Sequence, residues 1–413
     1  MSDPSRLERR LGVSDAVVLG LGSMIGAGVF AAISPAASAA GSGLLFGLAI
    51  AALVAYANAT SSAQLAAVYP EAGGTYVYGR ERLGPFWGFL AGWGFVVGKT
   101  ASLAAMALTV GAYALPGRER LIGVGAVLLM TAVNYAGVRK TANLAKVIVA
   151  FVLVALAVVV VASFATPTGS AANLADLTSG SPRGILEAAG LLFFAFAGYA
   201  RIATLGEEVI DPASTIPKAI PLALGVTLLV YAAVAVSALY AVGPDVLGAT
   251  SAPLVAAAEG GLSWASPLVR AGGTMAALGV LLSLLAGVSR TSFAMARNRE
   301  LPSWLAAVHQ DNKTPYRAEI AVGVAVASIT ALADLRGAIG FSSFAVLTYY
   351  GIANASAFTQ TGDDRRWPRW LQVLGMAGCA VLALALPIAS VLAGTSVLAV
   401  GAIVWAIRLR AGS

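Results

Sequence analysis

The stretch Leu21–Phe30, LGSMIGAGVF, lies inside an apolar run over about residues 16–40 that is long enough to cross a membrane. It nevertheless contains three glycines near its middle, Gly22, Gly26 and Gly28. Glycine weakens a helix by about 1 kcal/mol per site relative to alanine. The pattern predicts a membrane helix that is interrupted at its centre, with a first half ending near Met24 and a second half beginning near Gly26.

The composition of the whole chain supports a membrane setting. Of the 413 residues, 59% are hydrophobic and only 11% are charged, whereas soluble globular chains have about 25% charged residues. No long polar region interrupts the sequence, so we expect a single transmembrane domain over residues 1–413. The polar start, MSDPSRLERRLGVSD, precedes an apolar segment too long for a signal peptide, which predicts a retained cytosolic tail.

The inventory of reactive residues argues against enzymes and metal proteins. The chain has one cysteine, Cys379, and one histidine, His309. A Cys–His pair needs both residues in one site, and a zinc site needs several such ligands. We therefore predict no catalytic site, no metal and no cofactor. The net charge of +7 is explained by basic cytosolic loops, so we expect no nucleic acid partner.

About twelve segments are apolar enough to span a bilayer, each needing about 20 residues. With the N-terminus inside, most of the 26 lysine and arginine residues fall in inner loops, as the positive-inside rule requires. This orientation predicts a multi-pass protein of the cytoplasmic (inner) membrane with both termini in the cytosol. The predicted spans are centred near Gly26, Val54, Val97, Leu128, Leu153, Ala197, Leu229, Leu281, Val326, Val346, Ala380 and Ala399.

The sixth span, LLFFAFAGYARIATLGEEV (Leu191–Val209), is also interrupted, near Gly198. The first and sixth spans are five apart, and an odd number of spans reverses the polarity of a second unit. Matching broken helices in two inverted halves are typical of secondary transporters. We predict inverted repeats over about residues 15–166 and about 184–361, followed by two further helices over about residues 369–410.

A broken membrane helix leaves backbone groups that something else must satisfy. The half-helix that begins near Gly26 offers N–H groups and a positive dipole end, which suit a carboxylate. Carbonyl groups near Met24, Phe194 and Ala197 suit an ammonium group. The alternative is that Gly22 and Gly26 pack helices through small-xxx-small spacing. The second break favours a binding site for a small zwitterion such as an amino acid.

Four segments of the chain carry a family resemblance. They are GLGSMIGAGVF (Gly20–Phe30), YPEAGGTYVYGRERLGPFWGFLAGWG (Tyr69–Gly94), FFAFAGYARIATLGEEVIDPASTIPKAI (Phe193–Ile220) and SRTSFAMARNRELPSWLAAV (Ser289–Val308). They resemble the amino acid–polyamine–organocation (APC) superfamily and are closest to its cationic amino acid transporter-like bacterial permeases. The resemblance implies an all-α integral membrane protein with a LeuT-type 5+5 inverted repeat, broken helices 1 and 6, and two C-terminal helices.

The same resemblance implies where a substrate binds. The N–H groups of Ala27 and Gly28 would contact its carboxylate, and the carbonyls of Met24, Phe194 and Ala197 its amino group. The Phe194 ring would form a lid above it. The substrate-binding residues implied are Met24, Ile25, Gly26, Ala27, Gly28, Phe194, Ala197, Gly198 and Tyr199.

Two lysines are candidates for ion coupling. Lys99 lies near the middle of the third span, where a charge is costly and marks a functional hypothesis. The alternative is a structural lysine satisfied by carbonyls or by a buried acid. Proton-coupled relatives of the cationic branch have a lysine in helix five, at a position that falls near Val152 here. Lys146 lies about two turns earlier, where we expect its side chain to reach the cytosol.

Arg201 follows the second break by three residues, and Glu208 is seven residues further on. This spacing predicts that both lie on one helical face. Arginine stays charged, so Arg201 is a candidate for an inner gate or a substrate contact. The alternative is an internal salt bridge of Arg201 with Glu187, Glu207 or Glu208.

These observations favour secondary active transport of amino acids by alternating access, with the lipid bilayer as environment and protons as the coupling ion. Amino acid exchange is the second mechanism. A polyamine or other amine is the alternative substrate class, which the absence of acidic residues beside the breaks disfavours. A non-transporting membrane sensor is the rival class, and it would need a signalling domain.

Overall fold

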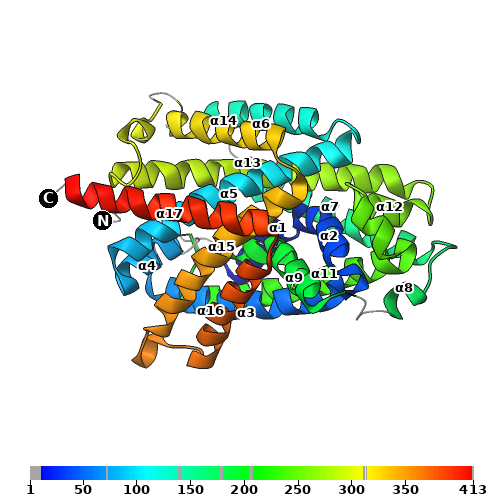
Figure 1. Cartoon of the computed structure of the whole chain (residues 1–413), viewed down its shortest axis with the longest axis horizontal. Helices are drawn as coiled ribbons and strands as arrows, with labels where there is room; N and C mark the ends of the chain where they lie inside the picture. Colours follow the sequence, from blue (N-terminus) through cyan, green and yellow to red (C-terminus); the bar gives the residue numbers. More distant parts are fainter. Residues whose placement is uncertain are drawn as a thin grey trace.

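A computed structural model describes residues 11–70, 73–137, 142–175, 180–203, 208–309, 312 and 314–411 (Figure 1). These residues are almost entirely helical, and their one extended pairing is an isolated parallel bridge between Leu11 and Val209. The elements, in chain order, are α1 (Val13–Met24), α2 (Ala27–Ala40), η1 (Gly41–Gly43), α3 (Leu44–Val68), α4 (Thr75–Leu83), α5 (Pro85–Ala114), α6 (Glu119–Tyr135), α7 (Ala142–Phe164), α8 (Ala172–Ala175), α9 (Pro182–Phe196), η2 (Ala197–Tyr199), α10 (Ala200–Ala203), α11 (Pro212–Ala249), α12 (Pro253–Glu259), α13 (Ala265–Arg297), η3 (Ser303–Ala306), α14 (Tyr316–Leu332), α15 (Leu335–Phe358), η4 (Gly362–Asp364), α16 (Arg369–Ala385) and α17 (Ile388–Ala411).

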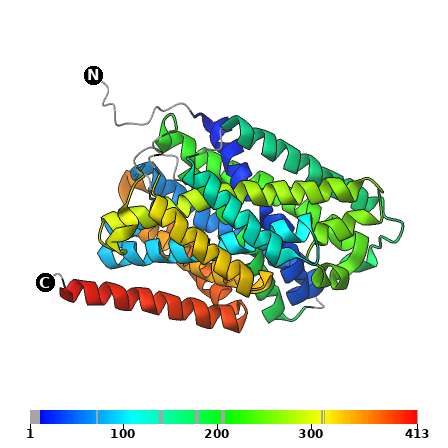
Figure 2. The same ribbon diagram turned by 90° about the horizontal axis from the view of Figure 1, so that it is seen from above.

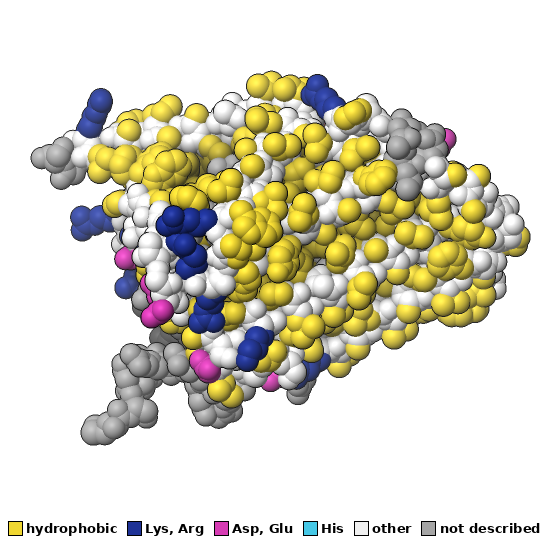
Figure 3. Space-filling model, turned by 90° about the horizontal axis from the view of Figure 1, so that it is seen from below, with side chains coloured by type: hydrophobic (Ala, Val, Ile, Leu, Met, Phe, Trp, Pro, Cys, Tyr) yellow, Lys and Arg dark blue, Asp and Glu magenta, His cyan; other side chains and the backbone are white. Residues whose placement is uncertain are grey.

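Many of these helices are suited to a bilayer by length and by surface. Leu229 and Leu332 expose 73% and 82% of their surface, which an aqueous setting disfavours but a lipid setting favours. Apolar side chains cover most of the face in Figure 3, and most of the visible lysine and arginine side chains gather toward one end. Within the described chain, seven segments are long and apolar enough to cross a membrane: Ala27–Val68, Pro85–Ala114, Leu144–Phe164, Pro182–Ala203, Pro212–Ala249, Ala265–Arg297 and Ile388–Arg410.

The predicted span centres agree with the helices of the structure. Gly26 and Ala197 lie at interruptions between helical segments, and the other predicted centres lie within helices. The centres near Leu128, Val326 and Val346 fall in α6, α14 and α15. The chain is therefore an all-helical, multi-pass membrane protein.

The long helix α5 runs through the middle of the helical assembly, where it packs against α13 and α15 (Figure 1). The interrupted pair α1 and α2 lies inside, in contact with α9 and α11. Figure 2 shows that α17 lies at the periphery of the assembly. This arrangement surrounds the first break with helices from both halves of the chain.

A charged cluster fixes the short helix α4 to the end of α13. The Arg80 guanidinium forms an ion pair with Glu300 and lies over the Tyr76 ring, 4.8 Å from its centroid. The Tyr76 hydroxyl donates to Glu300 at 2.7 Å and accepts from the Asn298 side chain at 2.8 Å. Burial raises the pKa of Tyr76 to about 12. The hydroxyl therefore stays protonated and remains a donor at neutral pH.

Candidate functional site: two broken helices

The first break is short and fully enclosed. Helix α1 ends at Met24, and the N–H of Ile25 donates to the Leu21 carbonyl at 2.7 Å. Gly26 has φ −88° and ψ −139°, which is not helical, and α2 starts at Ala27. Among the described residues, the backbone N–H groups of Gly26, Ala27 and Gly28 donate no hydrogen bond to a backbone carbonyl beyond those internal to helices. The start of α2 therefore presents amide donors and a positive dipole end inside the protein.

The second break is more gradual. Helix α9 ends at Phe196, and the chain passes through the 3-10 turn η2 before the four-residue helix α10. A 3-10 turn inside a helical span changes the hydrogen-bond partners of the backbone and often marks a functional hinge. Phe194 and Gly198 are partly exposed, whereas Ala195, Phe196, Ala197 and Tyr199 are buried. The segment therefore combines a buried wall with two accessible positions.

The two breaks touch each other through glycines. A Cβ atom at Gly28 would lie 2.7 Å from the Cα of Ala195, and one at Gly198 would lie 2.8 Å from the backbone nitrogen of Met24 and closer still to the carbonyl oxygen of Ser23. Real Cβ atoms do not approach backbone atoms this closely. Glycine is therefore required at both positions so that the two interrupted backbones can meet.

Two tyrosine hydroxyls satisfy the carbonyls that the breaks leave free. The Tyr231 hydroxyl, from α11, donates to the carbonyl of Met24 and lies 3.1 Å from the carbonyl of Ala195. The Tyr350 hydroxyl, from α15, donates to the carbonyl of Ala197 at 3.0 Å. Tyr231 thus joins the first break to the second through one polar group.

Sequence reasoning missed both tyrosines. Their signal is a phenol inside an otherwise apolar span, since a buried hydroxyl requires a hydrogen-bond partner. The ring of Tyr199 stacks on Tyr350 with centroids 5.0 Å apart. Tyr199, which the sequence places in the site, therefore lies beside the break and beside the tyrosine that bonds to it.

The predicted substrate-binding residues occupy the two breaks as a group. Met24 and Ile25 close α1, Gly26 precedes α2, and Ala27 and Gly28 begin it. Phe194 is partly exposed near the end of α9 and packs against the main core. Its role as a lid stays a prediction, as do the substrate contacts of the other residues.

Lys99 lies on α5, Pro85–Ala114, and is partly exposed. Gly92 and Phe95 lie on the same helical face, two turns and one turn earlier. Gly92 faces Tyr76 and the sulfur of Met295, and the Phe95 ring lies 5.6 Å from that of Tyr349. Lys99 therefore lies on an inward-facing side of α5.

Within the part of the chain that the structure describes, no ion pair or hydrogen bond of the Lys99 ammonium is present. The structural alternative for Lys99, satisfaction by carbonyls or by a buried acid, therefore has no support among these residues. A cation on an inward face of a spanning helix is a functional hypothesis by default.

The prediction that Arg201 and Glu208 share a helical face is wrong. Arg201 lies in α10, which ends at Ala203, whereas Glu208 lies in a turn. The backbone of Glu208 accepts the N–H of Leu11 at 3.1 Å, beside the isolated bridge to Val209. Glu208 therefore lies beside the start of α1 and not in helix α10.

The charge of Glu208 still acts on Arg201, and Arg290 is a second charged neighbour. Glu187, the other predicted partner of Arg201, instead binds Arg336 at 2.5 Å. Glu207 lies outside the described residues. Arg201 therefore belongs to a cluster of charges at one end of the second break.

Lys146 forms an ion pair with Asp15, with 3.3 Å between Nζ and Oδ1, and both side chains are largely exposed. The interaction joins the start of α7 to the start of α1. An exposed pair of this kind contributes about 0–1 kcal/mol. Lys146 is therefore a surface contact and lies apart from the break.

The space beside the first break is small. A hollow of about 10 Å³ borders Gly26, and apolar side chains of α7 and α13 line it, Val152 and Val280 among them. Volumes below about 10–15 Å³ do not hold even one water molecule. This hollow, between α1, α7 and α13, therefore has no room for an amino acid.

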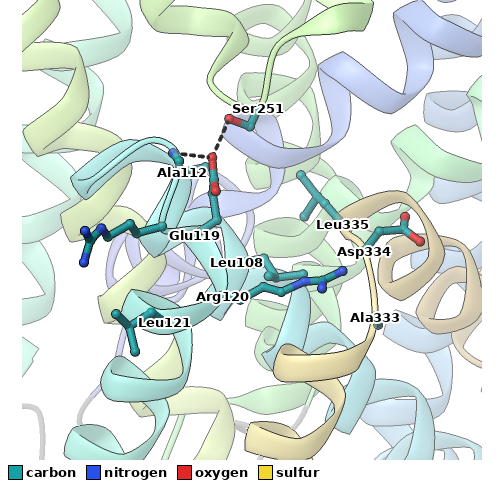
Figure 4. Close-up of a pocket in the computed structure, with 11 residues that line it drawn as sticks. Leu108, Ala112, Glu119, Arg120, Leu121, Ser251, Ala333, Asp334 and Leu335 are labelled. Atoms are coloured by element: carbon teal, nitrogen blue, oxygen red, sulfur yellow. Dashed lines mark hydrogen bonds between the residues drawn. The ribbon is translucent and has the colours of Figure 1, made fainter.

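A larger cavity, about 560 Å³, lies away from the breaks (Figure 4). It is bordered by the end of α5, the start of α6 and the connection between α14 and α15. The Glu119 carboxylate accepts hydrogen bonds from the N–H of Gly117 at 2.9 Å and the hydroxyl of Ser251 at 3.3 Å. Asp334 caps α15 through the N–H of Gly337 at 2.8 Å. These carboxylates have structural partners, and the cavity lies outside the broken-helix site.

Among the described residues, no group of three or more His, Cys, Asp or Glu side chains lies close enough together to hold a metal ion.

Comparison with known proteins identifies the family. The sequence pattern of the amino acid permeases matches residues 11–407. The chain belongs to the amino acid permease family. This permease is a transporter and not an enzyme, and the family supports amino acid transport across a membrane.

Three relatives illustrate the sequence similarity of the permease to other transporters. It is 61% identical over 406 residues to an uncharacterized transporter of Mycobacterium tuberculosis, which covers 98% of this chain and 92% of that protein. It is 28% identical over 361 residues to the branched-chain amino acid permease BcaP of Bacillus subtilis, covering 81% and 77%. It is 27% identical over 399 residues to the chloroplastic cationic amino acid transporter 6 of Arabidopsis thaliana, covering 88% and 68%.

Proposed function

We propose that the permease carries neutral amino acids across the cytoplasmic membrane by alternating access, with proton symport as the driving mechanism. The observation that carries this proposal is the contact between the two breaks. The amides of Ala27 and Gly28 lack partners among the described residues, and they lie beside carbonyls that a displaceable tyrosine hydroxyl occupies. An amino acid presents a carboxylate to the former and an ammonium group to the latter.

Substrate binding would displace the two tyrosine hydroxyls from the carbonyls of the breaks. Tyr231 donates to Met24 and Ala195, and Tyr350 to Ala197. An incoming ammonium group has three donors and can replace these hydroxyls at the carbonyls. Such an exchange releases the link between the breaks, so the site opens as the substrate enters. In this scheme the hydroxyls occupy the ammonium position in the substrate-free protein.

The charges favour neutral over cationic substrates. The segments 23–28 and 194–203 contain no acidic side chain, so a second positive charge on a substrate has no partner there. BcaP of Bacillus subtilis bears the name of a branched-chain permease, which agrees with this preference. The plant relative is named for cationic amino acids, which makes lysine and arginine the comparison substrates in the test.

Lys99 is the proposed coupling residue. It lies on an inward face of α5 and has no partner in the described structure. A lysine in such a place changes its protonation when the surrounding path closes and removes water from it. The substrate cycle would thereby bind and release one proton per turn of the transporter.

Exchange without ion coupling is the second candidate. Val149 and Val152 face the hollow beside Gly26, and this hollow contains no ionisable side chain. The position at which cationic-branch relatives have a coupling lysine is thus apolar here. This observation favours an exchanger if Lys99 has no role in coupling.

The topology belongs to the same proposal. We assign the first inverted repeat to α1 through α7, about residues 15–166, and the second to α9 through α15, about residues 184–361. Helices α16 and α17 follow as two additional spans, about residues 369–410. Both termini lie in the cytosol, on the side toward which the basic loops point.

The test uses purified protein in liposomes. Uptake of each radiolabelled amino acid is measured with an inward pH gradient, with a sodium gradient, and with unlabelled amino acid inside. We expect uptake of neutral amino acids driven by the pH gradient, lost in Lys99→Met and retained in Thr100→Val. Thr100 is the matched control because its hydroxyl bonds only to its own helix, to the Val96 carbonyl at 2.7 Å.

Three results would redirect the proposal. Uptake only against internal amino acid would establish the exchanger. Uptake of polyamines in place of amino acids would contradict the proposal that the amides of Ala27 and Gly28 bind a substrate carboxylate. A folded protein that binds amino acids in a thermal shift assay but moves none would indicate a sensor.

A further inference from the structure

A row of buried polar side chains runs through α3, α15 and α16 and extends away from the second break. Asn58, Ser61 and Gln64 recur at intervals of three residues along α3 and are fully buried. Asn354 and Gln360 extend along and just beyond α15 and are buried as completely. Buried polar residues inside a membrane protein are costly and mark ion or substrate paths.

The row begins at the second break. The Tyr350 hydroxyl bonds to the Ala197 carbonyl, and the carbonyl of Tyr350 accepts the side-chain amide of Asn354 at 2.8 Å. That amide also donates to the Asn58 oxygen at 2.6 Å, while the Ser61 hydroxyl donates to the Asn354 oxygen at 2.7 Å. Each polar group in this part of the row therefore touches the next.

The row ends at the connection between α15 and α16. The Gln64 side-chain amide donates to the Ala357 carbonyl at 3.2 Å, and its oxygen lies 3.4 Å from the N–H groups of Arg366 and Trp367. The Arg365 guanidinium binds the Gln360 carbonyl at 2.6 Å. This connection is rich in arginine and is predicted to face the cytosol. The part of α15 from Tyr350 to its end at Phe358 is about 12 Å long, and Gln360 lies two residues beyond it.

Several groups along the row have no protein partner. Both side-chain polar atoms of Gln360 and of Gln372 are buried without a hydrogen bond, as is the Asn58 amide nitrogen. Leaving such a group unsatisfied costs about 1–3 kcal/mol. Buried groups of this kind are normally satisfied by ordered water, which makes about three hydrogen bonds in each site.

Helix α16 supplies the third wall of the row. Gln372, Gly375 and Cys379 lie on one face of it at helical spacing. A Cβ atom at Gly375 would lie 2.6 Å from the side-chain carbon Cγ of Asn354, so glycine leaves the space that the amide occupies. The Cys379 thiol lies 3.4 Å from the Asn58 oxygen. Three helices thus direct polar groups toward one line.

We propose that this row is a water-lined path that leads protons between the cytosolic end of the protein and the second break. Its role in coupling rests on the proposed symport, whereas its hydration does not. The amide and hydroxyl groups do not titrate near neutral pH, so they order the waters, and the proton moves along the waters. Helix packing by polar side chains is the alternative, and the unpartnered amides of Gln360 and Gln372 argue against packing as their only role.

Cys379 provides a test of hydration that is independent of transport, because it is the only cysteine in the chain. Its S–H stretching band is followed by infrared spectroscopy after transfer of the liposomes to D2O. The control is Cys379→Ala/Val127→Cys, which moves the thiol to a fully buried position in α6. We expect the native thiol to exchange at least about tenfold faster, since water satisfies the polar groups around it. Equal rates of thiol exchange at positions 379 and 127 would refute the proposal that the row is lined by water.

Gln360→Met tests the role in coupling. The side chain of Gln360 has no protein partner, so the substitution breaks no protein hydrogen bond and nearly preserves volume. The control on α15 is Ser356→Ala, whose hydroxyl bonds only to its own helix, to the Ile352 carbonyl at 2.8 Å. We expect Gln360→Met to lower pH-driven accumulation about tenfold while exchange of internal for external amino acid is kept, and Ser356→Ala to change neither.

The outcomes separate the two proposals. If Gln360→Met retains full pH-driven accumulation with a raised melting temperature, the row is dry and serves packing, and the path is refuted. If the native protein shows no pH-driven uptake but its thiol exchanges quickly, the symport fails and the water-lined site stands without a role in coupling. Gln372→Met, with the same unpartnered amide, repeats the test if Gln360→Met does not fold.

Discussion

The two breaks interrupt a membrane helix in different ways. The first changes from helix to helix within two residues, and Met24, Ile25 and Ala27 around it are all buried. The second passes through a 3-10 turn and a four-residue helix, and leaves Phe194 and Gly198 partly exposed. The difference suggests a fixed anchor at the first break and an adaptable, accessible wall at the second.

The atoms nearest to the glycine also differ between the two breaks. Gly26 is approached by the side chain of Val280, whereas Gly198 is approached by the backbone of Ser23 and Met24. A side chain can be shortened by a second substitution, but a backbone cannot. Substitutions at Gly198 and Gly26 can therefore tell the two kinds of contact apart.

Gly198→Ala should have the largest effect. The added methyl group would overlap the Ser23 carbonyl and lie 2.8 Å from the Met24 nitrogen, so the two breaks must separate. Overpacking of this kind costs about 1–3 kcal/mol, and displacement of both backbones adds to it. We expect uptake to fall at least about a hundredfold, measured as initial rate in liposomes at equal protein content.

Shortening side chains around Gly198 should not restore activity, because the obstacle is backbone. Recovery of Gly198→Ala by a side-chain substitution would show that the breaks are not in backbone contact. The control is Gly225→Ala on α11, where an added Cβ meets nothing within 4 Å.

Gly26→Ala should reduce uptake about tenfold, because one methyl group against one valine methyl costs about 1–2 kcal/mol. In contrast to Gly198→Ala, the loss should be largely repaired in Gly26→Ala/Val280→Ala, which removes the obstructing group. The comparison of single and double variants is made at matched expression. A double variant as inactive as the single one would mean that Gly26 is required for its backbone conformation.

Tyr231→Phe removes the hydroxyl that joins the breaks. Two buried carbonyls lose a donor, so we expect the melting temperature of the substrate-free protein to fall by several degrees. The substrate no longer competes with the hydroxyl for those carbonyls. Saturating amino acid should therefore raise the melting temperature more in Tyr231→Phe than in the native protein.

The matched control for this prediction is Tyr113→Phe, whose hydroxyl bonds to the Phe30 carbonyl in the first turn of α2 at 3.1 Å and not to the carbonyls of Met24 or Ala195. If saturating amino acid raises the melting temperature equally in Tyr231→Phe and in the native protein, Tyr231 does not compete with the substrate.

Lys146→Met should have the smallest effect. The ion pair with Asp15 is exposed, and screening by solvent limits its contribution to about 0–1 kcal/mol. We expect uptake and its dependence on the pH gradient to change by about twofold or less. Loss of pH-driven uptake in this variant would identify Lys146, and not Lys99, as the coupling residue.

The sequence by itself determined where the helices break. Glycines at Gly26 and Gly198, small neighbours and apolar flanks act locally on the backbone, so their effect can be read without knowing the fold. The same local signals predicted the positions of the spans and the membrane setting. The family resemblance also came from the sequence, through four segments of which two include the breaks.

Only the tertiary structure decided which groups complete the breaks. Tyr231 and Tyr350 lie more than a hundred residues from the carbonyls of Met24 and Ala197 that they bind, and no periodicity in the sequence links them. The error over Arg201 and Glu208 has the same origin, because the backbone of Glu208 pairs with Leu11, which is distant in sequence. Local conformational preference is written residue by residue, whereas a hydrogen bond between distant helices depends on how all of them pack.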